Sequence, residues 1–165
     1  KKLKQIKTTT PTILVLIADH TSGYFSKRMD KFAIPFLIHR TDNLEPIERP
    51  FAASQRDIAP TILDFMGWEQ PKSFAGLSLL RHYENRFSDY YTSGLLGWIK
   101  KDKMIEVDIH NTSQFFCYSR QGSSIQYSET TCSKAYHPLR NEALSFTKYS
   151  QDLLFKGKTE TFQLF

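Results

Sequence analysis

Two adjacent residues that can ligate a metal follow an apolar run near the start of the chain. Asp19 and His20 come directly after the apolar residues 13–18. A carboxylate oxygen together with a neutral imidazole nitrogen suits Zn²⁺ or Mn²⁺. Both side chains can reach one ion, because the chain leaving a strand can turn them toward a single point. The pair also fits a simpler interpretation, in which the carboxylate caps the next element beside a polar histidine, and two ligands do not complete a site.

The apolar run before this pair predicts a buried strand. Residues 12–18 are rich in β-branched side chains and present no polar face. This pattern is typical of the parallel strands of α/β sheets, which are covered on both sides. Ligands collect at the carboxyl ends of strands in such sheets. Asp19 and His20 therefore lie where a site is expected.

Further segments predict the rest of the fold. A second strand is expected at or just after Pro35, because proline cannot donate to a strand ladder. Residues 54–67 predict a helix that begins with Asp57 as its N-cap or with a capping box from Ser54, and that ends at Gly67. The remaining predicted elements are strands at 94–99, 104–109 (half-buried), 114–118 and 125–127, and a closing helix at 139–156. The expected fold class is α/β, part of a mixed sheet flanked by helices, with a small C-terminal antiparallel sheet.

Composition and charge exclude several classes of protein. The 165 residues are 40% hydrophobic and 24% charged, which excludes a disordered tail and a collagen-like repeat. Part of the net charge of +5 comes from four lysines within residues 1–7, which we interpret as the solvated face of a helix end. We expect no nucleic-acid binding, because no RNP-type motif, zinc-finger spacing or long basic helix is present. No apolar run approaches the 18–20 residues, roughly, of a membrane-spanning helix.

The two cysteines leave two alternatives open. Cys117 and Cys132 lack the spacing of a zinc site. They form one disulfide, closing a loop of about 15 residues, or they remain two buried thiols. The redox state of the compartment decides between the two.

Four motifs occur in series over residues 12–80. They are IADH at 17–20, IPFLI at 34–38, SQRDIAPTILD at 54–64 and FAGLSLL at 74–80. In this order they resemble the C-terminal part of the sulfatase-like branch of the alkaline phosphatase superfamily. The chain looks most like the group of lipoteichoic acid synthases and phosphoglycerol or phosphoethanolamine transferases, in which a small antiparallel sheet and a final helix follow. One departure is Thr21, which stands where the family has a glycine.

The resemblance implies a metal-dependent reaction on phosphodiesters or sulfate esters. Asp19 and His20 would be two ligands of a divalent cation, Mn²⁺ or Zn²⁺ in preference to Ca²⁺ or Mg²⁺. In the family a hydroxyl nucleophile, activated by the metal, forms a covalent intermediate. That nucleophile and the remaining acidic ligand lie upstream in the family, so we expect no catalytic residue in this chain and no activity of the chain alone. His39 is a candidate substrate contact, because it follows the second strand and could approach the same strand end. Residues 54–64 are structural in the family, so Asp57 and Pro60 are interpreted as capping and shape.

The same resemblance implies partners and a location. The expected partners are an N-terminal half of the catalytic domain and, as substrate, a phospholipid or a sulfated or phosphorylated glycan. The parent protein would be held in the cell membrane by upstream segments, with its catalytic domain facing the periplasm or the extracellular side, where a Cys117–Cys132 bridge is permitted. Residues 1–87 would belong to the sulfatase-like core, and residues 88–165 would add the small sheet and terminal helix to the same domain. The alternatives are a fragment of a plain sulfate-ester hydrolase and a non-catalytic interaction module.

Overall fold

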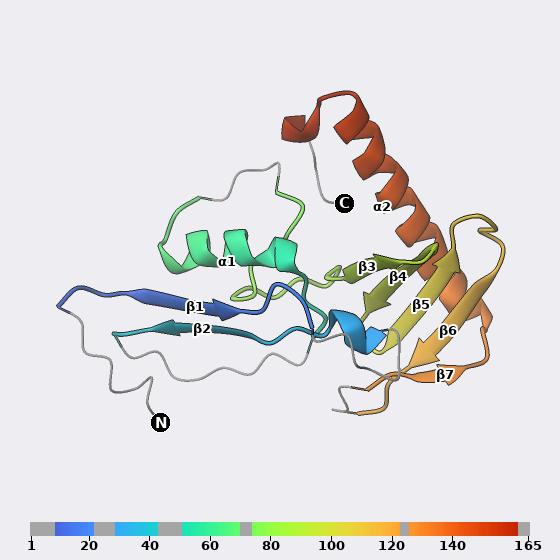
Figure 1. Ribbon diagram of the computed structural model, residues 1–165, viewed down its shortest axis with the longest axis horizontal. Helices are drawn as coiled ribbons and strands as arrows, with labels where there is room; N and C mark the ends of the chain where they lie inside the picture. Colours follow the sequence, from blue (N-terminus) through green and yellow to red (C-terminus); the bar gives the residue numbers. More distant parts are fainter. Residues whose placement is uncertain (1–8, 22–28, 43–50, 70–73, 123–125, 162–165) are drawn as a thin grey trace. The chain divides into compact units, whose positions relative to one another are not determined.

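The computed structural model describes residues 9–21, 29–42, 51–69, 74–122 and 126–161 (Figure 1). The chain forms two compact units, residues 1–48 and residues 49–165, and each is considered by itself. The helix end expected at residues 1–7 lies outside the described residues. The assignment of residues 1–87 to a sulfatase-like core stays a prediction. Within the described residues, no helix has the length and apolar character needed to cross a membrane.

The first unit contains a two-stranded antiparallel sheet. Strand β1 spans Ile13–Ile17, a short 3-10 helix η2 spans Met29–Phe32, and strand β2 spans Phe36–Arg40. In the register Ile13 faces Arg40 and Ile17 faces Phe36. Strand β2 begins directly after Pro35, as predicted.

The prediction that β1 is a parallel strand covered on both sides is wrong for the described residues. The strand pairs antiparallel with β2, and Leu16 and Ile17 keep 51% and 41% of their surface exposed. A continuous apolar run locates a strand, but it does not identify what the strand pairs with. The described residues supply one partner strand and leave part of the apolar surface uncovered.

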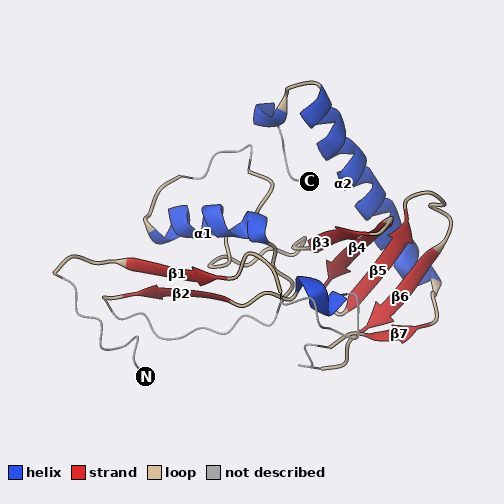
Figure 2. Cartoon of the chain, in the orientation of Figure 1, coloured by secondary structure: helices blue, strands red, loops and turns tan. Residues whose placement is uncertain are grey.

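The second unit is built around a five-stranded antiparallel sheet (Figure 2). Its strands are paired in the order β3-β4-β5-β6-β7. They span Ser88–Thr92, Leu95–Lys100, Lys103–Asp108, Phe115–Ser119 and Ser128–Thr130. The predicted strands at 94–99, 104–109 and 114–118 are confirmed as β4, β5 and β6. Strand β3 was not predicted. The prediction of a strand at 125–127 is wrong, because residues 126 and 127 belong to no strand and β7 begins at Ser128; residue 125 lies outside the described residues.

Among the described residues, two α-helices complete this unit. A 3-10 turn η3, Gln55–Asp57, leads into helix α1, Ile58–Phe65. Gly67 follows α1 with a φ of 70°, the left-handed conformation that ends many helices. A second 3-10 turn η4, Lys134–Tyr136, leads into helix α2, His137–Phe155, and a turn η5, Thr159–Thr161, follows it. Both predicted helices are confirmed, with α2 beginning two residues before the expected position.

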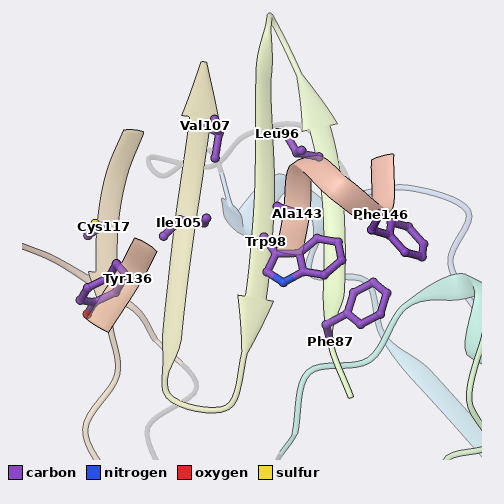
Figure 3. Packing of buried hydrophobic residues seen from close by; sticks show 9 residues of the cluster. All are labelled: Phe87, Leu96, Trp98, Ile105, Val107, Cys117, Tyr136, Ala143 and Phe146. Atoms are coloured by element: carbon purple, nitrogen blue, oxygen red, sulfur yellow. The ribbon is translucent and has the colours of Figure 1, made fainter. Parts of the chain in front are cut away.

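The hydrophobic core lies between α2 and one face of the sheet (Figures 1 and 3). Strand β4 contributes Leu96 and Trp98, and α2 contributes Ala143 and Phe146. The rings of Phe87 and Trp98 are stacked with centroids 4.0 Å apart, and Phe146 meets Phe87 edge-on at 4.8 Å. Such contacts add to the free energy of burying these large side chains.

Strand β5 is buried on both faces, so the prediction of a half-buried strand is wrong. Ile105 and Val107 belong to the core, but Glu106 on the other face is also only 1% exposed. The carboxylate of Glu106 accepts hydrogen bonds from the hydroxyls of Tyr90, at 2.7 Å, and Tyr118, at 2.8 Å. These two bonds compensate for the loss of water around a buried carboxylate.

A disulfide joins Cys117 in β6 to Cys132, 15 residues later and before η4. Replacing both cysteines by alanine is expected to lower the free energy of unfolding by about 3 kcal/mol, because the open chain gains conformational entropy when unfolded. Urea unfolding followed by circular dichroism measures the change. Reduced wild-type protein should show the same loss. An unfolding midpoint that does not respond to reductant would contradict the prediction.

Candidate functional site

Asp19 and His20 follow β1 and are exposed, with 88% and 80% of their side-chain surface accessible. The backbone N–H of Ala18 donates to the carbonyl of Pro35 at 3.3 Å and extends the pairing of the strands to this point. Asp19 Oδ1 accepts the backbone N–H of His20 at 2.9 Å, and Asp19 Oδ2 lies 3.6 Å from His20 Nε2. The two side chains therefore converge where β1 ends.

Hydrogen bonds orient the His20 ring. Its Nδ1 lies 2.7 Å from the carbonyl oxygen of Thr21, and a carbonyl can only accept, so Nδ1 carries the proton and donates. In the neutral imidazole this leaves the lone pair on Nε2, the nitrogen that faces Asp19. The Thr21 carbonyl and, secondarily, the Asp19 charge raise the pKa of His20. The Thr21 hydroxyl donates to the Lys31 carbonyl at 2.7 Å, which ties the turn to η2.

The pair fits part of a metal shell. With metal–ligand bonds of about 2.0–2.1 Å, two neighbouring ligands in a tetrahedral shell lie about 3.3 Å apart. The 3.6 Å between Asp19 Oδ2 and His20 Nε2 is close to that separation. In the part of the chain that the structure describes, no group of three or more His, Cys, Asp or Glu side chains is placed to hold a metal ion. Asp19 and His20 would thus be two ligands of a larger set.

His39 lies away from this strand end, and its role as a substrate contact stays a prediction. In the antiparallel register His39 faces Leu14, whereas Phe36 faces Ile17 at the end that leads to Asp19. His39 lies three positions after Phe36 along the strand, which is a distance of about 10 Å. Because β2 runs antiparallel to β1, His39 lies farther from Asp19 and His20 than Phe36 does.

A second cluster of polar side chains surrounds the start of α1. Asp57 is 2% exposed. Its Oδ1 accepts the backbone N–H of Leu77 at 2.8 Å, and its Oδ2 accepts the backbone N–H of Ser54 at 3.0 Å and Arg86 Nη1 at 3.0 Å. Burial raises the pKa of Asp57, against the effect of these donors. The capping box between Ser54 and Asp57 is confirmed, whereas Asp57 makes no side-chain cap on α1. Its carboxylate also holds the loop 74–80.

The remaining polar residues of α1 bind the same loop. The Thr61 hydroxyl accepts the backbone N–H of Leu79 at 2.9 Å, and Asp64 accepts the Ser78 hydroxyl at 2.7 Å. Gly76 lies so close to the backbone that an added Cβ would be 1.9 Å from the carbonyl oxygen of Arg56. The motifs at 54–64 and 74–80 therefore form one structural unit, which explains why they occur together in the sequence.

The stability of the second unit is expected to depend on pH through the carboxylate of Asp64. Hydrogen bonds from Arg81 and, to a lesser extent, from Ser78 lower the pKa of Asp64. Its pKa is therefore lower in the folded chain than in the unfolded one, so its contribution to stability is present at neutral pH and is lost as the pH falls through the folded pKa. Asp64→Asn should show a smaller loss of stability between about pH 5 and pH 2 than the wild type, measured by urea unfolding. Asp152→Asn, an exposed carboxylate on α2, is the matched control and should follow the wild type; equal acid sensitivity of both variants would contradict the prediction.

Comparison with known proteins identifies a shared fold. No family model and no curated protein matched the sequence. The structure is similar to a crystal structure of a protein in the alkaline phosphatase superfamily from Vibrio parahaemolyticus, with a TM-score of 0.65 and 20% sequence identity. The match covers 85% of this chain and 35% of that chain, so this chain spans about a third of the length of the protein it matches. The predicted α/β fold with a C-terminal antiparallel sheet and closing helix is confirmed.

Proposed function

We propose that this chain is the C-terminal part of the catalytic domain of a metal-dependent transferase or hydrolase that acts on phosphodiesters or sulfate esters. The observation that carries the proposal is the convergence of Asp19 Oδ2 and His20 Nε2, 3.6 Å apart at the end of β1. It occurs in a fold similar to that of a protein of the alkaline phosphatase superfamily. The four motifs in series favour transfer of phosphoglycerol or phosphoethanolamine to cell-envelope glycans or lipids over hydrolysis of sulfate esters.

Each residue of the pair has a defined part in this proposal. The carboxylate of Asp19 supplies negative charge to hold a divalent cation, and His20 supplies a neutral nitrogen donor. A bound cation, Mn²⁺ or Zn²⁺ in preference to Ca²⁺ or Mg²⁺, lowers the pKa of a hydroxyl nucleophile and stabilises charge on the ester oxygens. The Thr21 carbonyl keeps the lone pair of His20 on Nε2. The Thr21 hydroxyl, through its bond to Lys31, fixes the turn that carries both ligands.

The remaining ligand and the nucleophile would come from an N-terminal half of the domain. Leu16, Ile17 and Leu37 of the two-stranded sheet are 51%, 41% and 45% exposed. Two strands alone are marginally stable in water, and apolar strand residues gain free energy when further elements cover them. This surface supports the packing of additional strands or helices against β1 and β2.

We also propose that the domain lies outside the cytoplasm, anchored to the cell membrane by segments of the parent protein. The Cys117–Cys132 disulfide supports this location, because such bonds persist in oxidising compartments. The substrate would then be a phospholipid or a phosphorylated or sulfated glycan of the envelope.

Calorimetric titration with Mn²⁺ and Zn²⁺ tests the proposal, together with cleavage of bis(p-nitrophenyl) phosphate and p-nitrophenyl sulfate. The chain of 165 residues should bind metal weakly and cleave neither ester. The same chain produced with the coding region upstream of it should bind metal stoichiometrically and cleave at least one ester. Tight metal binding with turnover by the 165-residue chain would overturn its assignment as an incomplete site, and an inactive longer protein would overturn the enzymatic function.

A further inference from the structure

One tripeptide of the chain matches the sequence that accepts N-linked glycans. That sequence is an asparagine, any residue except proline, and then a serine or threonine. The chain has four asparagines, and Asn111, followed by Thr112 and Ser113, meets the requirement. A motif of three residues also arises by chance, so its surroundings in the structure decide whether it can be a site. The asparagines without a serine or threonine two positions later are Asn43, Asn85 and Asn141.

The motif lies in the turn that connects β5 to β6 (Figure 1), and all three of its residues are exposed. Hydrogen bonds within the turn hold its shape. Asp108 Oδ1 accepts the backbone N–H of His110 at 2.8 Å and that of Asn111 at 3.3 Å, and the backbone N–H of Gln114 donates to the Asn111 carbonyl at 2.8 Å. Because no residue of the motif belongs to the hydrophobic core, an enzyme can modify the turn without disturbing the packing of the sheet.

The side-chain amide of Asn111 leaves its nitrogen available for reaction. Asn111 Oδ1 accepts the hydroxyl of Ser113 at 2.6 Å. Among the described residues, Asn111 Nδ2 has no hydrogen-bond partner. The hydroxyl that the motif requires therefore lies beside the amide oxygen, and the amide nitrogen, which can donate two hydrogen bonds, faces no competing group.

The disulfide is a second, independent observation in favour of this modification. N-linked glycans are found on surface loops of exported proteins. The Cys117–Cys132 bond is typical of the oxidising compartments that exported proteins enter. Cys117 lies on β6, the strand into which the turn leads. The inference rests on the location outside the cytoplasm that belongs to the proposed function.

We propose that Asn111 is an N-glycosylation site. The donor is an oligosaccharide linked to a polyprenyl diphosphate, and a separate transferase catalyses the step. Asn111 Nδ2 forms a bond to the anomeric carbon of the first sugar, and the bond between that carbon and the diphosphate oxygen breaks. The polyprenyl diphosphate leaves with the electron pair of the broken bond, and Nδ2 loses one proton.

Mass spectrometry of the protein isolated from its own cells tests the proposal. Trypsin cleaves after Lys103 and Arg120, so the peptide 104–120 contains both Asn111 and Cys117. Free thiols are alkylated first, and the protein is then digested without a reductant. The state of the disulfide and the state of the asparagine are thereby read from one peptide. We expect this peptide to be held in the disulfide and to carry a glycan on Asn111 in most copies of the protein.

The two ways in which the inference can fail give different results. A peptide that is held in the disulfide but carries no glycan would overturn the glycosylation of Asn111 and leave the proposed location unaffected. A peptide with alkylated Cys117 and no glycan would overturn the location outside the cytoplasm, and this inference would fail with it.

Substitutions in the same cells show whether the motif directs the modification. Asn111→Gln and Ser113→Ala should each remove the glycan, which is measured as loss of the modified peptide and faster migration in gel electrophoresis. Ser113→Thr keeps the hydroxyl and should retain the glycan. Asn141→Gln, at an exposed asparagine of α2 outside any such motif, is the matched control and should be modified as the wild type is. A Ser113→Ala variant that still carries the glycan would overturn the assignment to this motif.

Discussion

Replacing Arg86 with methionine is expected to lower the free energy of unfolding by about 3–5 kcal/mol. The side chains of Arg86 and Asp57 are 6% and 3% exposed, and Arg86 Nη1 lies 3.0 Å from Asp57 Oδ2. Arg86 also donates to the backbone carbonyls of Leu77 and Ser78. Its removal leaves a buried carboxylate without its counter-charge and two carbonyls without a donor. Burial raises the pKa of Asp57 and lowers the pKa of Arg86, because it makes each charge costly, and the charge of the partner acts in the opposite direction on each pKa.

A double-mutant cycle separates this pair from a general loss of packing. Arg86→Met, Asp57→Asn and the double variant are compared by urea unfolding. The double variant should be less destabilised than the sum of the two single variants by more than about 1 kcal/mol, because the first substitution already breaks the interaction. Lys148→Met, at an exposed lysine of α2, should change the free energy of unfolding by less than about 0.5 kcal/mol. If the destabilisation of the double variant equals the sum of the two single variants, Arg86 and Asp57 are not coupled.

Local signals in the sequence predicted most of the helices and strands, but they did not predict contacts between residues far apart in the sequence. The start and end of α1 were predicted because the capping residues and Gly67 act within one turn of the helix. The burial of Glu106 was not predicted, because its partners Tyr90 and Tyr118 lie 16 and 12 residues away. The partners of β1 were mispredicted for a related reason, since an apolar run fixes the location of a strand and not its neighbours.

The same division between local signals and contacts of distant residues applies to the candidate site. The convergence of Asp19 and His20 could be expected because adjacent residues share one turn. The position of His39 was not predicted, because it depends on the direction in which β2 runs back along β1. Arg86 gave no signal, since it meets Asp57 across 29 residues of sequence.

The sequence allowed a disulfide between Cys117 and Cys132 but did not determine whether it forms. Two cysteines 15 residues apart are compatible with a bond, and the fold places their Cα atoms 5.2 Å apart, within the range for a disulfide. Pairing of β6 with β7 positions Cys117 opposite Thr130, two residues before Cys132. The strand register therefore determines the bridge, and that register depends on contacts along the whole sheet.

In the complete catalytic domain that the proposed function requires, His20→Ala is expected to lower kcat/KM for ester cleavage by at least about 100-fold. Loss of residues that merely support a metal ligand typically costs about 10- to 100-fold, and loss of a ligand itself should cost no less. The reason is local: Nε2 of His20 is the nitrogen whose lone pair faces Asp19. Asp19→Asn should have a similar effect, because it keeps the shape of the side chain and removes its charge.

Metal binding and folding must be measured on the same variants to show that the loss comes from the site. Stoichiometric binding of Mn²⁺ or Zn²⁺ should weaken in His20→Ala, whereas the unfolding midpoint of the metal-free protein should stay within experimental error, because the His20 side chain is 80% exposed. His110→Ala, at an exposed histidine after β5, is the matched control and should retain both activity and metal affinity. If His20→Ala keeps activity within tenfold of the wild type, the strand end that carries Asp19 and His20 is not the metal site. The pair would then have the structural role that the sequence left open for it.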